Sequence, residues 1–366
     1  MKTKKPDYYK IDEIERKKAD LNLIYGQREN GKSFAVKKRA LLKFCEEPEK
    51  NQIIYLRRRQ ADLKDKGAVE QYFADTIRKI KLPAPFTEYN QVYSVGNRIF
   101  IAKLDEKGKY ADPLPLGFKV ALSEAERIKS RAYPEVSDII FEEFAATSGE
   151  ITNEIESFKS VLSTCTRGAS SVRVWMIGNT ISRLSCYFRE LELTNIPKQK
   201  PGTIDTYFMD GFGTNEDGTP KQIKICVERC ATSKDTNSAL VFGRSAKIIN
   251  GGEWYSEEQP KLPSDWDGSD IYTIVFDVLG FKYLAVLQCD NKTGALVWFI
   301  SPKTTPIQKN TRIISDKIST DPLTTYGLRP LSQSEGEVFK LFNLNKVFFS
   351  DNLTGTEFKQ AMKTFF

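Results

Sequence analysis

Residues 26–33, GQRENGKS, combine residue types and a spacing that could bind a chain of phosphates. Glycine begins the stretch and returns at Gly31, directly before Lys32 and Ser33. In this pattern the backbone N–H groups of the loop surround the phosphates, the lysine reaches the outer phosphates, and the hydroxyl group binds Mg²⁺. We expect the following residues to bind the nucleotide: Gly26, Gln27, Arg28, Glu29, Asn30, Gly31, Lys32 and Ser33.

The segments on either side of this loop have the character that a phosphate-binding loop requires. The apolar run LNLIY precedes the loop and is typical of a short buried strand. After the loop, apolar residues recur at helical spacing in FAVKKRALLKF. A strand, a glycine-flanked loop and a helix therefore follow one another, and the positive end of the helix dipole points at the expected phosphates.

A second apolar run, VSDIIFEEF at 136–144, ends in the adjacent acids Glu142 and Glu143. In phosphate-transferring enzymes, an acid at the end of such a strand supports Mg²⁺ and a neighbouring acid activates the attacking water. The first acid is commonly Asp, so Glu142 brings one extra methylene to the metal side. Asp138 is an alternative metal ligand, but it lies toward the other end of the strand. Without a role in catalysis, Glu142 and Glu143 would simply cap a strand in solvent.

Other polar residues lie at the ends of further expected strands. Asn179 ends the run SVRVWMIGN, where an amide could orient water and sense the γ-phosphate, or could simply form a turn. Arg167 precedes that run, in a loop from which ring ATPases offer an arginine to a neighbour's nucleotide, or is simply solvated. Arg57, Arg58 and Arg59 follow the run NQIIYL and either face a polyanion such as DNA or are solvated.

Strand and helix patterns alternate up to about residue 200, which favours an α/β domain with a mostly parallel sheet. The composition then shifts toward Pro, Gly, Asp and Thr, and a later antiparallel meander at 271–300 has a hairpin signal at DNKTG. We expect a P-loop ATPase domain of the ASCE (RecA-like) class, a loop or linker region, and a smaller C-terminal α+β domain, at residues 1–205, 206–262 and 263–366 respectively.

Composition limits the kinds of chemistry that remain. The chain contains no histidine, which excludes histidine-dependent triads and mixed Cys/His zinc sites. Its six cysteines are scattered and are expected to be buried and reduced. The net charge of +7 is compatible with nucleic acid binding. No apolar run reaches the roughly 18 residues of a membrane span, and no signal peptide is evident, so we expect a cytoplasmic protein without a membrane partner.

The order of these motifs resembles the DNA packaging ATPases of small tailed phages with protein-primed genomes. The resemblance rests on IYGQRENGKS, IIYLRRRQADL, SRAYPEVSDIIFEEF, TRGASSVRVWMIGNTIS and CYF, and it covers residues ~20–190 well. The run AYPEVSDIIFEEF is the most specific piece, because it extends beyond a generic acidic strand.

The resemblance implies roles for individual residues. The loop at 26–33 matches the Walker A loop of the family. Glu142 stands where the family commonly has the Walker B aspartate, and Glu143 matches the catalytic glutamate. Arg167 and Lys129 match basic residues that act across the subunit interface, and Asn179 matches the end of the sensing strand.

The resemblance also implies partners and a second domain. Family members form a pentameric ring on the portal vertex of a procapsid and thread double-stranded DNA through it, with ATP and Mg²⁺ as cofactors. Their location is the host cytoplasm and, transiently, the procapsid; a scaffold RNA is a further partner that the sequence leaves open. Their C-terminal domain is similar to an RNase H-like nuclease that has lost catalysis. Asp277 and Asp290 are too few for a two-metal site, so we expect no cleavage.

Three functions remain open from the sequence. The first is an ATP-driven ring motor that translocates double-stranded DNA into a procapsid. The second is a helicase-type P-loop ATPase that acts on nucleic acid without a capsid, which strand separation would reveal. The third is a nucleotide-binding assembly subunit without turnover, which is favoured only by Glu142 in place of aspartate.

Overall fold

The computed structural model describes residues 8–65, 67–145, 151–167, 171–180, 182–231 and 253–363. The chain divides into two compact units. The first contains Met1–Ile181 and Asn195–Glu253, and the second contains Ser182–Thr194 and Trp254–Phe366. Within the described residues, none of the helices has the length and apolar character needed to cross a membrane.

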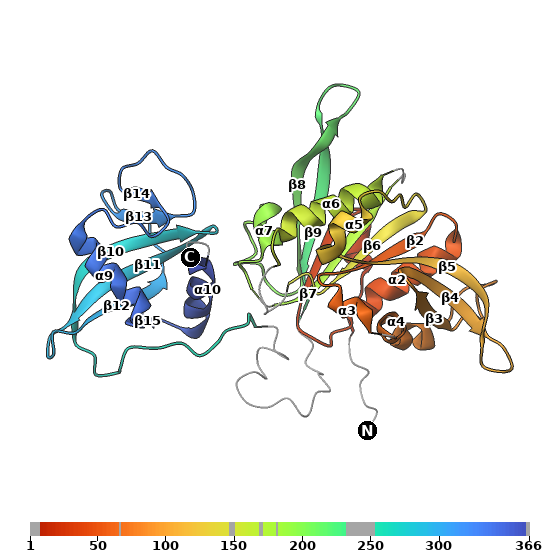
Figure 1. The fold of residues 1–366 in the computed structure, drawn as a ribbon, viewed down its shortest axis with the longest axis horizontal. Helices are drawn as coiled ribbons and strands as arrows, with labels where there is room; N and C mark the ends of the chain where they lie inside the picture. The colour runs from red at the N-terminus through yellow and green to blue at the C-terminus, as the bar shows by residue number, and fades with distance from the viewer. Residues whose placement is uncertain are drawn as a thin grey trace. The chain divides into compact units, whose positions relative to one another are not determined.

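The first unit is built on a nine-stranded sheet with the order β3-β4-β5-β2-β6-β7-β1-β9-β8 (Figure 1). Its strands are β1 (Leu21–Gly26), β2 (Gln52–Arg57), β3 (Gln91–Val95), β4 (Arg98–Leu104), β5 (Tyr110–Ala121), β6 (Val136–Glu142), β7 (Arg173–Asn179), β8 (Thr203–Thr214) and β9 (Pro220–Arg229). From β5 to β9 in this order, neighbouring strands are parallel, while β3, β4 and β8 pair antiparallel at the edges. The prediction of an α/β domain with a mostly parallel sheet is confirmed.

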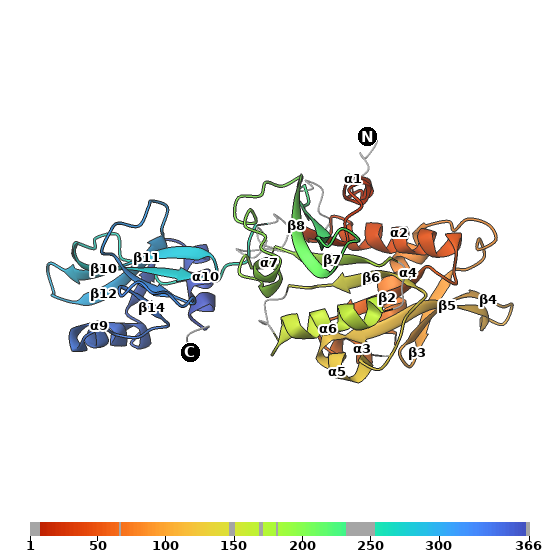
Figure 2. The same cartoon turned by 90° about the horizontal axis from the view of Figure 1, so that it is seen from above.

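Helices cover both faces of this sheet (Figure 2). They are α1 (Asp12–Arg16), α2 (Lys32–Glu46), α3 (Ala61–Lys64), α4 (Ala68–Lys79), the 3₁₀ helix η1 (Leu122–Glu124), α5 (Ala125–Ile128) and α6 (Glu154–Thr166). Helix α2 packs against α4, and α5 packs against α6. Because side chains alternate along a strand, β6 serves both faces. Phe141 stacks on Phe158 of α6, whereas Asp138 and Glu142 bond to residues of α2.

Residues 206–229 belong to a β-hairpin, although the sequence predicts a loop or linker at 206–262. Strands β8 and β9 form an antiparallel hairpin, and β9 also pairs in parallel with β1. Figure 1 shows the outer part of this hairpin extending away from the body of the unit. The turn-rich composition belongs to this exposed part, where Phe208 is 63 % exposed. The inner part of β9 is buried, including Ile225, Cys226 and Val227.

The second unit contains a six-stranded sheet with the order β14-β13-β10-β11-β12-β15. Its elements are α7 (Cys186–Glu190), β10 (Gly268–Val278), β11 (Phe281–Asp290), β12 (Leu296–Pro302), β13 (Arg312–Ser315), β14 (Thr324–Tyr326), α9 (Gln333–Asn343), β15 (Val347–Phe349) and α10 (Asn352–Met362). Strands β10, β11 and β12 form the predicted meander. Trp298 and Phe276 lie in the core beneath α9 and α10, where Phe342 and Phe358 contact them.

Residues 182–194 belong to the second unit, although the sequence placed them in the ATPase domain. The Arg183 guanidinium donates to both carboxylate oxygens of Glu357 in α10, at 2.5 Å each. Leu184 is fully buried in the core of the second unit. The chain therefore contributes to the second unit at 182–194, returns to the first unit for β8 and β9, and then continues into β10.

Candidate nucleotide-binding site

The GQRENGKS loop lies between β1 and α2, and both of its glycines adopt backbone angles that favour glycine. Gly26 has φ +147° and Gly31 has φ +93°. A Cβ atom on Gly26 would come within 3.2 Å of the Cys230 Cβ. The two positions thus depend on glycine for conformation, and at Gly26 also for close packing against the chain that follows β9.

Lys32, at the start of α2, is buried and turns back into the loop. Its ammonium group donates to the backbone oxygen of Gln27 at 2.5 Å and to Oδ1 of Asn30 at 3.2 Å. Burial lowers the pKa of Lys32. The amine is therefore held inside the loop by acceptors that phosphate oxygens could replace. Arg28 and Glu29 are instead exposed at the outside of the loop.

The acidic strand β6 brings Glu142 to the first turn of α2. The Ser33 hydroxyl donates to Oε1 of Glu142 at 2.5 Å, and the Tyr72 hydroxyl of α4 donates to Oε2 at 2.8 Å. Burial raises the pKa of Glu142. A serine hydroxyl beside a carboxylate is an all-oxygen donor set, which suits a Mg²⁺ ion that takes its other ligands from phosphates and water. These residues fit the expected metal.

Glu143, the next residue, has a backbone with φ +55°, a left-handed conformation that is uncommon for residues other than glycine. Its Oε2 accepts from Nη2 of Arg57 at 2.8 Å, and its side chain is 55 % exposed. Because φ is positive at Glu143, its side chain no longer follows the alternation of side chains between the two faces of the sheet. The structure thus separates the adjacent acids, with Glu142 against α2 and Glu143 against the end of β2.

Strand β7 places Asn179 beside the loop. Asn179 is the register partner of Gly26 in the parallel pairing of β7 with β1. Asn179 lines a cavity of about 1410 Å³ together with Lys32, Ser33, Glu142 and Glu143. Nine of the residues singled out from the sequence therefore line one cavity: Arg28, Glu29, Asn30, Gly31, Lys32, Ser33, Glu142, Glu143 and Asn179. The last three lie at the carboxyl edge of the parallel strands, where α/β sheets bind their ligands.

Arg167 and Lys129 lie elsewhere. Arg167 follows α6 and is exposed, and Lys129 follows α5 and bonds to Glu126 at 2.6 Å. Both precede strands whose carboxyl ends reach the cavity, so they lie toward the amino edge of the sheet, and neither lines the cavity. Since α5 and α6 pack together, the two cations lie on neighbouring elements.

The three arginines after β2 have different environments. Arg57 pairs with Glu143, as described above, and Arg59 is exposed. Arg58 is 6 % exposed, and its Nε and Nη2 each donate to the Glu154 carboxylate at 2.6 Å. The prediction that Arg58 contacts DNA is corrected by this burial, because its guanidinium joins β2 to the first residue of α6.

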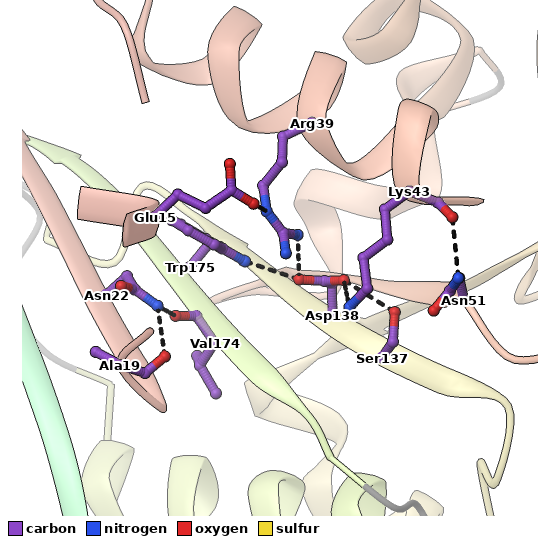
Figure 3. Close-up of polar contacts among 10 residues, drawn as sticks. All are labelled: Glu15, Ala19, Asn22, Arg39, Lys43, Asn51, Ser137, Asp138, Val174 and Trp175. Atoms are coloured by element: carbon purple, nitrogen blue, oxygen red, sulfur yellow. Dashed lines mark hydrogen bonds and ion pairs between the residues drawn. The ribbon is translucent and has the colours of Figure 1, made fainter. Parts of the chain in front are cut away.

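Asp138 is not near the cavity end of β6. Its carboxylate accepts from Nη1 of Arg39 at 2.5 Å, from Nζ of Lys43 at 2.9 Å and from Nε1 of Trp175 at 2.8 Å (Figure 3). Glu15 of α1 accepts from the other side of the Arg39 guanidinium, at 2.6 Å. Asp138 therefore connects β6 to α2 and β7 and, through Arg39, to α1. Its carboxylate is occupied by these contacts and is not the metal ligand.

The sequence interpretation missed contacts that the N-terminal segment makes with the loop. The backbone N–H of Tyr9 donates to the backbone oxygen of Asn30 at 2.8 Å. The Tyr9 hydroxyl donates to Oε2 of Glu228, at the end of β9, at 2.7 Å. Burial raises the pKa of Glu228 to about 7. No motif pointed to these residues, because their proximity depends on the pairing of β9 with β1.

Comparisons with known proteins agree with the motif order. Residues 3–201 match the family described as podovirus DNA encapsidation protein (Gp16). The chain is 32 % identical over 288 residues to the DNA packaging protein of Bacillus phage B103, covering 71 % of this chain and 83 % of that protein. It is also 32 % identical over 171 residues to the DNA packaging protein of Bacillus phage phi29, covering 46 % of this chain and 45 % of that protein.

A solved structure described as the bacteriophage Phi-29 viral genome packaging motor assembly has the same fold. The alignment covers 98 % of this chain and 100 % of that chain, with a TM-score of 0.53 and 20 % sequence identity. The sequence match over more than half of the chain, together with the relative from phage B103, identifies the family. This chain belongs to the podovirus DNA encapsidation protein family.

Proposed function

We propose that the chain is a subunit of a viral genome packaging motor that hydrolyses ATP to move double-stranded DNA into a procapsid. The observation that carries the proposal is that one cavity is lined by an amine, a hydroxyl, two carboxylates and an amide, from Lys32, Ser33, Glu142, Glu143 and Asn179. Family membership supports DNA packaging as the process that ATP hydrolysis drives.

Nucleotide binding starts from the loop. Backbone N–H groups of residues 26–33 and the N-terminus of α2 surround the phosphates of ATP. When ATP binds, the Lys32 ammonium group gives up its hydrogen bond to the backbone oxygen of Gln27 and bonds to the β- and γ-phosphates instead. The exchange keeps the amine hydrogen-bonded before and after binding, so its burial is compensated in both states.

Ser33 and Glu142 would hold Mg²⁺ in this proposal, and the ion would supply positive charge beside the transferring phosphoryl group. Glu143 then acts on the attacking water, for which its carboxylate must leave Arg57. Asn179 orients that water from the adjacent strand. The ion pair between Arg57 and Glu143 therefore belongs to a resting state, in which Arg57 holds the carboxylate of the catalytic base Glu143.

Arg167 and Lys129 act on the nucleotide of a neighbouring subunit in this proposal. Their position away from the cavity of their own chain supports a role in trans, because neither could reach that nucleotide without a large movement. A closed ring supplies a neighbour to every subunit, and we propose a homo-oligomeric ring, a pentamer, on the portal of the procapsid. We place the ring in the host cytoplasm before it docks.

DNA contacts are proposed to be mainly with phosphates, since a packaging motor moves every sequence. Arg59 is exposed at the end of β2 and remains a candidate for such a contact. Binding should therefore weaken steeply with salt and show little base preference. A scaffold RNA would be held through the same chemistry.

The second unit is proposed to be RNase H-like. Its meander β10-β11-β12 is extended by β13, parallel to β10, and by β14, parallel to β13, and this strand order supports the assignment. Asp277 pairs with Lys282 near one end of the β10–β11 hairpin, while Asp290 is at the other end. At about 3.3 Å per residue the two acids are on the order of 30 Å apart, too far to share a metal pair. We propose that this unit does not cleave DNA.

One observation speaks against the alternative of an assembly subunit without turnover. That alternative rested on Glu142 in place of aspartate, and the structure accommodates the longer side chain between Ser33 and Tyr72. The helicase alternative shares every feature of the cavity and differs only in the partner.

The test is ATP hydrolysis measured with double-stranded DNA, with and without matching procapsids. We expect procapsids and DNA to stimulate hydrolysis, and Glu143→Gln to lower the rate by at least about 100-fold while ATP still binds. Glu47→Gln is the matched control, because Glu47 is exposed and pairs only with nearby Lys50 in the described contacts. Undetectable hydrolysis in the unaltered protein under all these conditions contradicts the proposal, and strand separation without procapsids favours the helicase.

A further inference from the structure

The carboxylate of Glu142 is bonded on both of its oxygens by hydroxyl groups from different helices. Ser33 of α2 donates to Oε1 and Tyr72 of α4 donates to Oε2. We propose that Tyr72 is a positioning residue that fixes the Glu142 carboxylate toward Ser33 and thereby sets the affinity for the Mg²⁺–nucleotide complex. This inference rests on the proposed function of the cavity.

The hydroxyl of Tyr72 is held in place by the packing of its ring. The ring stacks on Tyr55 of β2, with centroids 4.3 Å apart and an interplanar angle of 20°. The ammonium group of Lys37 lies 4.5 Å from the centroid of the Tyr72 ring. Lys37 also donates to the Tyr72 backbone oxygen at 2.5 Å and to Asp75 at 2.6 Å, which fastens α4 to α2. The donor therefore has a fixed position relative to the loop.

The length of the glutamate explains why a second donor is needed. An aspartate at position 142 would be shorter by one methylene, about 1.5 Å, and hydrogen bonds of 2.5 and 2.8 Å have no slack of that size. Glu142 spans the gap between Ser33 and Tyr72, but its extra torsion angle adds rotamers that point elsewhere. The Tyr72 hydrogen bond selects the rotamer whose Oε1 faces Ser33.

This rotamer matters because of the direction of the Ser33 hydroxyl. By donating its hydrogen to Oε1 of Glu142, Ser33 keeps its lone pairs available for a cation. If Glu142 turned away, the hydroxyl would lose its acceptor and both oxygen ligands would be disordered. Tyr72 therefore acts on the metal site through Glu142, without touching the nucleotide.

The test compares ADP affinity with and without Mg²⁺, measured by titration calorimetry on the full chain. We expect Tyr72→Phe to weaken ADP binding in Mg²⁺ by about 5- to 10-fold, within the range for one lost hydrogen bond, and to leave binding in EDTA within about twofold. Tyr133→Phe is the control, because Tyr133 is also a tyrosine packed inside the first unit, but its ring contacts Phe118 and not Tyr55. The control should leave the Mg²⁺ dependence unchanged.

A double-mutant cycle with Glu142→Asp separates positioning from a general loss of packing. In the aspartate background the carboxylate no longer spans both donors, so Tyr72→Phe should add less than about twofold. Equal losses in Mg²⁺ and EDTA, or an unchanged Mg²⁺ dependence, overturn the role of Tyr72 and leave the proposed function intact. Failure of the unaltered protein to bind ADP at all overturns both.

Discussion

The two ends of β6 carry acids on the same face of the strand, in opposite surroundings. Asp138 near the amino end is 1 % exposed and is bonded by the cations Arg39 and Lys43 as well as by an indole N–H (Figure 3). Glu142 at the carboxyl end lines the cavity and is bonded by two neutral hydroxyl groups.

The difference shows how a fold separates a structural acid from a functional one. Cations beside Asp138 compensate the cost of burying its charge, and they are fixed parts of the protein. Hydroxyl groups compensate less, and burial raises the pKa of Glu142 despite them. The charged form of Glu142 is thus energetically unfavourable in the free protein and becomes favourable when a divalent cation binds beside it.

Removing the charge of Asp138 should produce the largest effect. Asp138→Asn keeps the shape of the side chain but leaves the Arg39 guanidinium, whose side chain is 8 % exposed, without its buried counter-charge. We expect the free energy of unfolding of the first unit to fall by about 3–5 kcal/mol. Urea unfolding followed by circular dichroism measures the change.

The surface pair Lys50–Glu47 supplies the control for that experiment. Both side chains are more than half exposed, so Glu47→Gln should change stability by less than about 1 kcal/mol. A loss for Asp138→Asn no larger than for Glu47→Gln would mean that the network in Figure 3 adds nothing to stability.

The equivalent change at the other end of β6 should affect activity and spare stability. Glu142→Gln removes a charge that burial disfavours, so we expect the free energy of unfolding to stay within about 1 kcal/mol or to rise. Hydrolysis in Mg²⁺ should fall by about 100-fold, because the metal loses its acidic support. Measuring unfolding and ATP hydrolysis on the same preparation sharpens the comparison, and a destabilised but active variant would reverse it.

Much of the cavity could be predicted from the sequence because its motifs are local. The loop at 26–33 follows an apolar run and precedes a helical pattern, and Glu142 and Glu143 end another apolar run. Parallel strands bring their carboxyl ends to one edge, so the order of these segments already implied that they meet. Asn179 joined the cavity for the same reason.

Contacts made across the sheet could not be predicted in this way. Arg58 and Arg59 are adjacent and chemically identical, yet only the position of Glu154 at the start of α6 decides that the first is buried. Tyr72 lies in α4, and nothing in its own segment of the sequence points to the distant acid that its hydroxyl meets. Strands β8 and β9 were missed because their exposed half has the composition of a loop.

A third acid tests whether hydroxyl partners are the feature that matters. Glu228 is bonded by the Tyr9 hydroxyl, and burial raises its pKa to about 7 from an ordinary value of 4.5. Between those two pH values the unfolded chain loses this proton and the folded chain keeps it. Stability should therefore fall as the pH rises through this window, by on the order of 3 kcal/mol, and should change no further at this residue above it.

Glu228→Gln should remove this part of the pH dependence, and urea unfolding between pH 5 and pH 8 measures it. The variant should be more stable than the unaltered protein at pH 8 and nearly equal at pH 5, because only the charged form of Glu228 is penalised. Asp138→Asn should show the opposite ranking at pH 8, since there the charged form is the one that the cations stabilise. If Glu228→Gln instead destabilises the protein at pH 8, the acid is stabilised by its surroundings as Asp138 is, and the division between cation-bonded and hydroxyl-bonded acids does not hold.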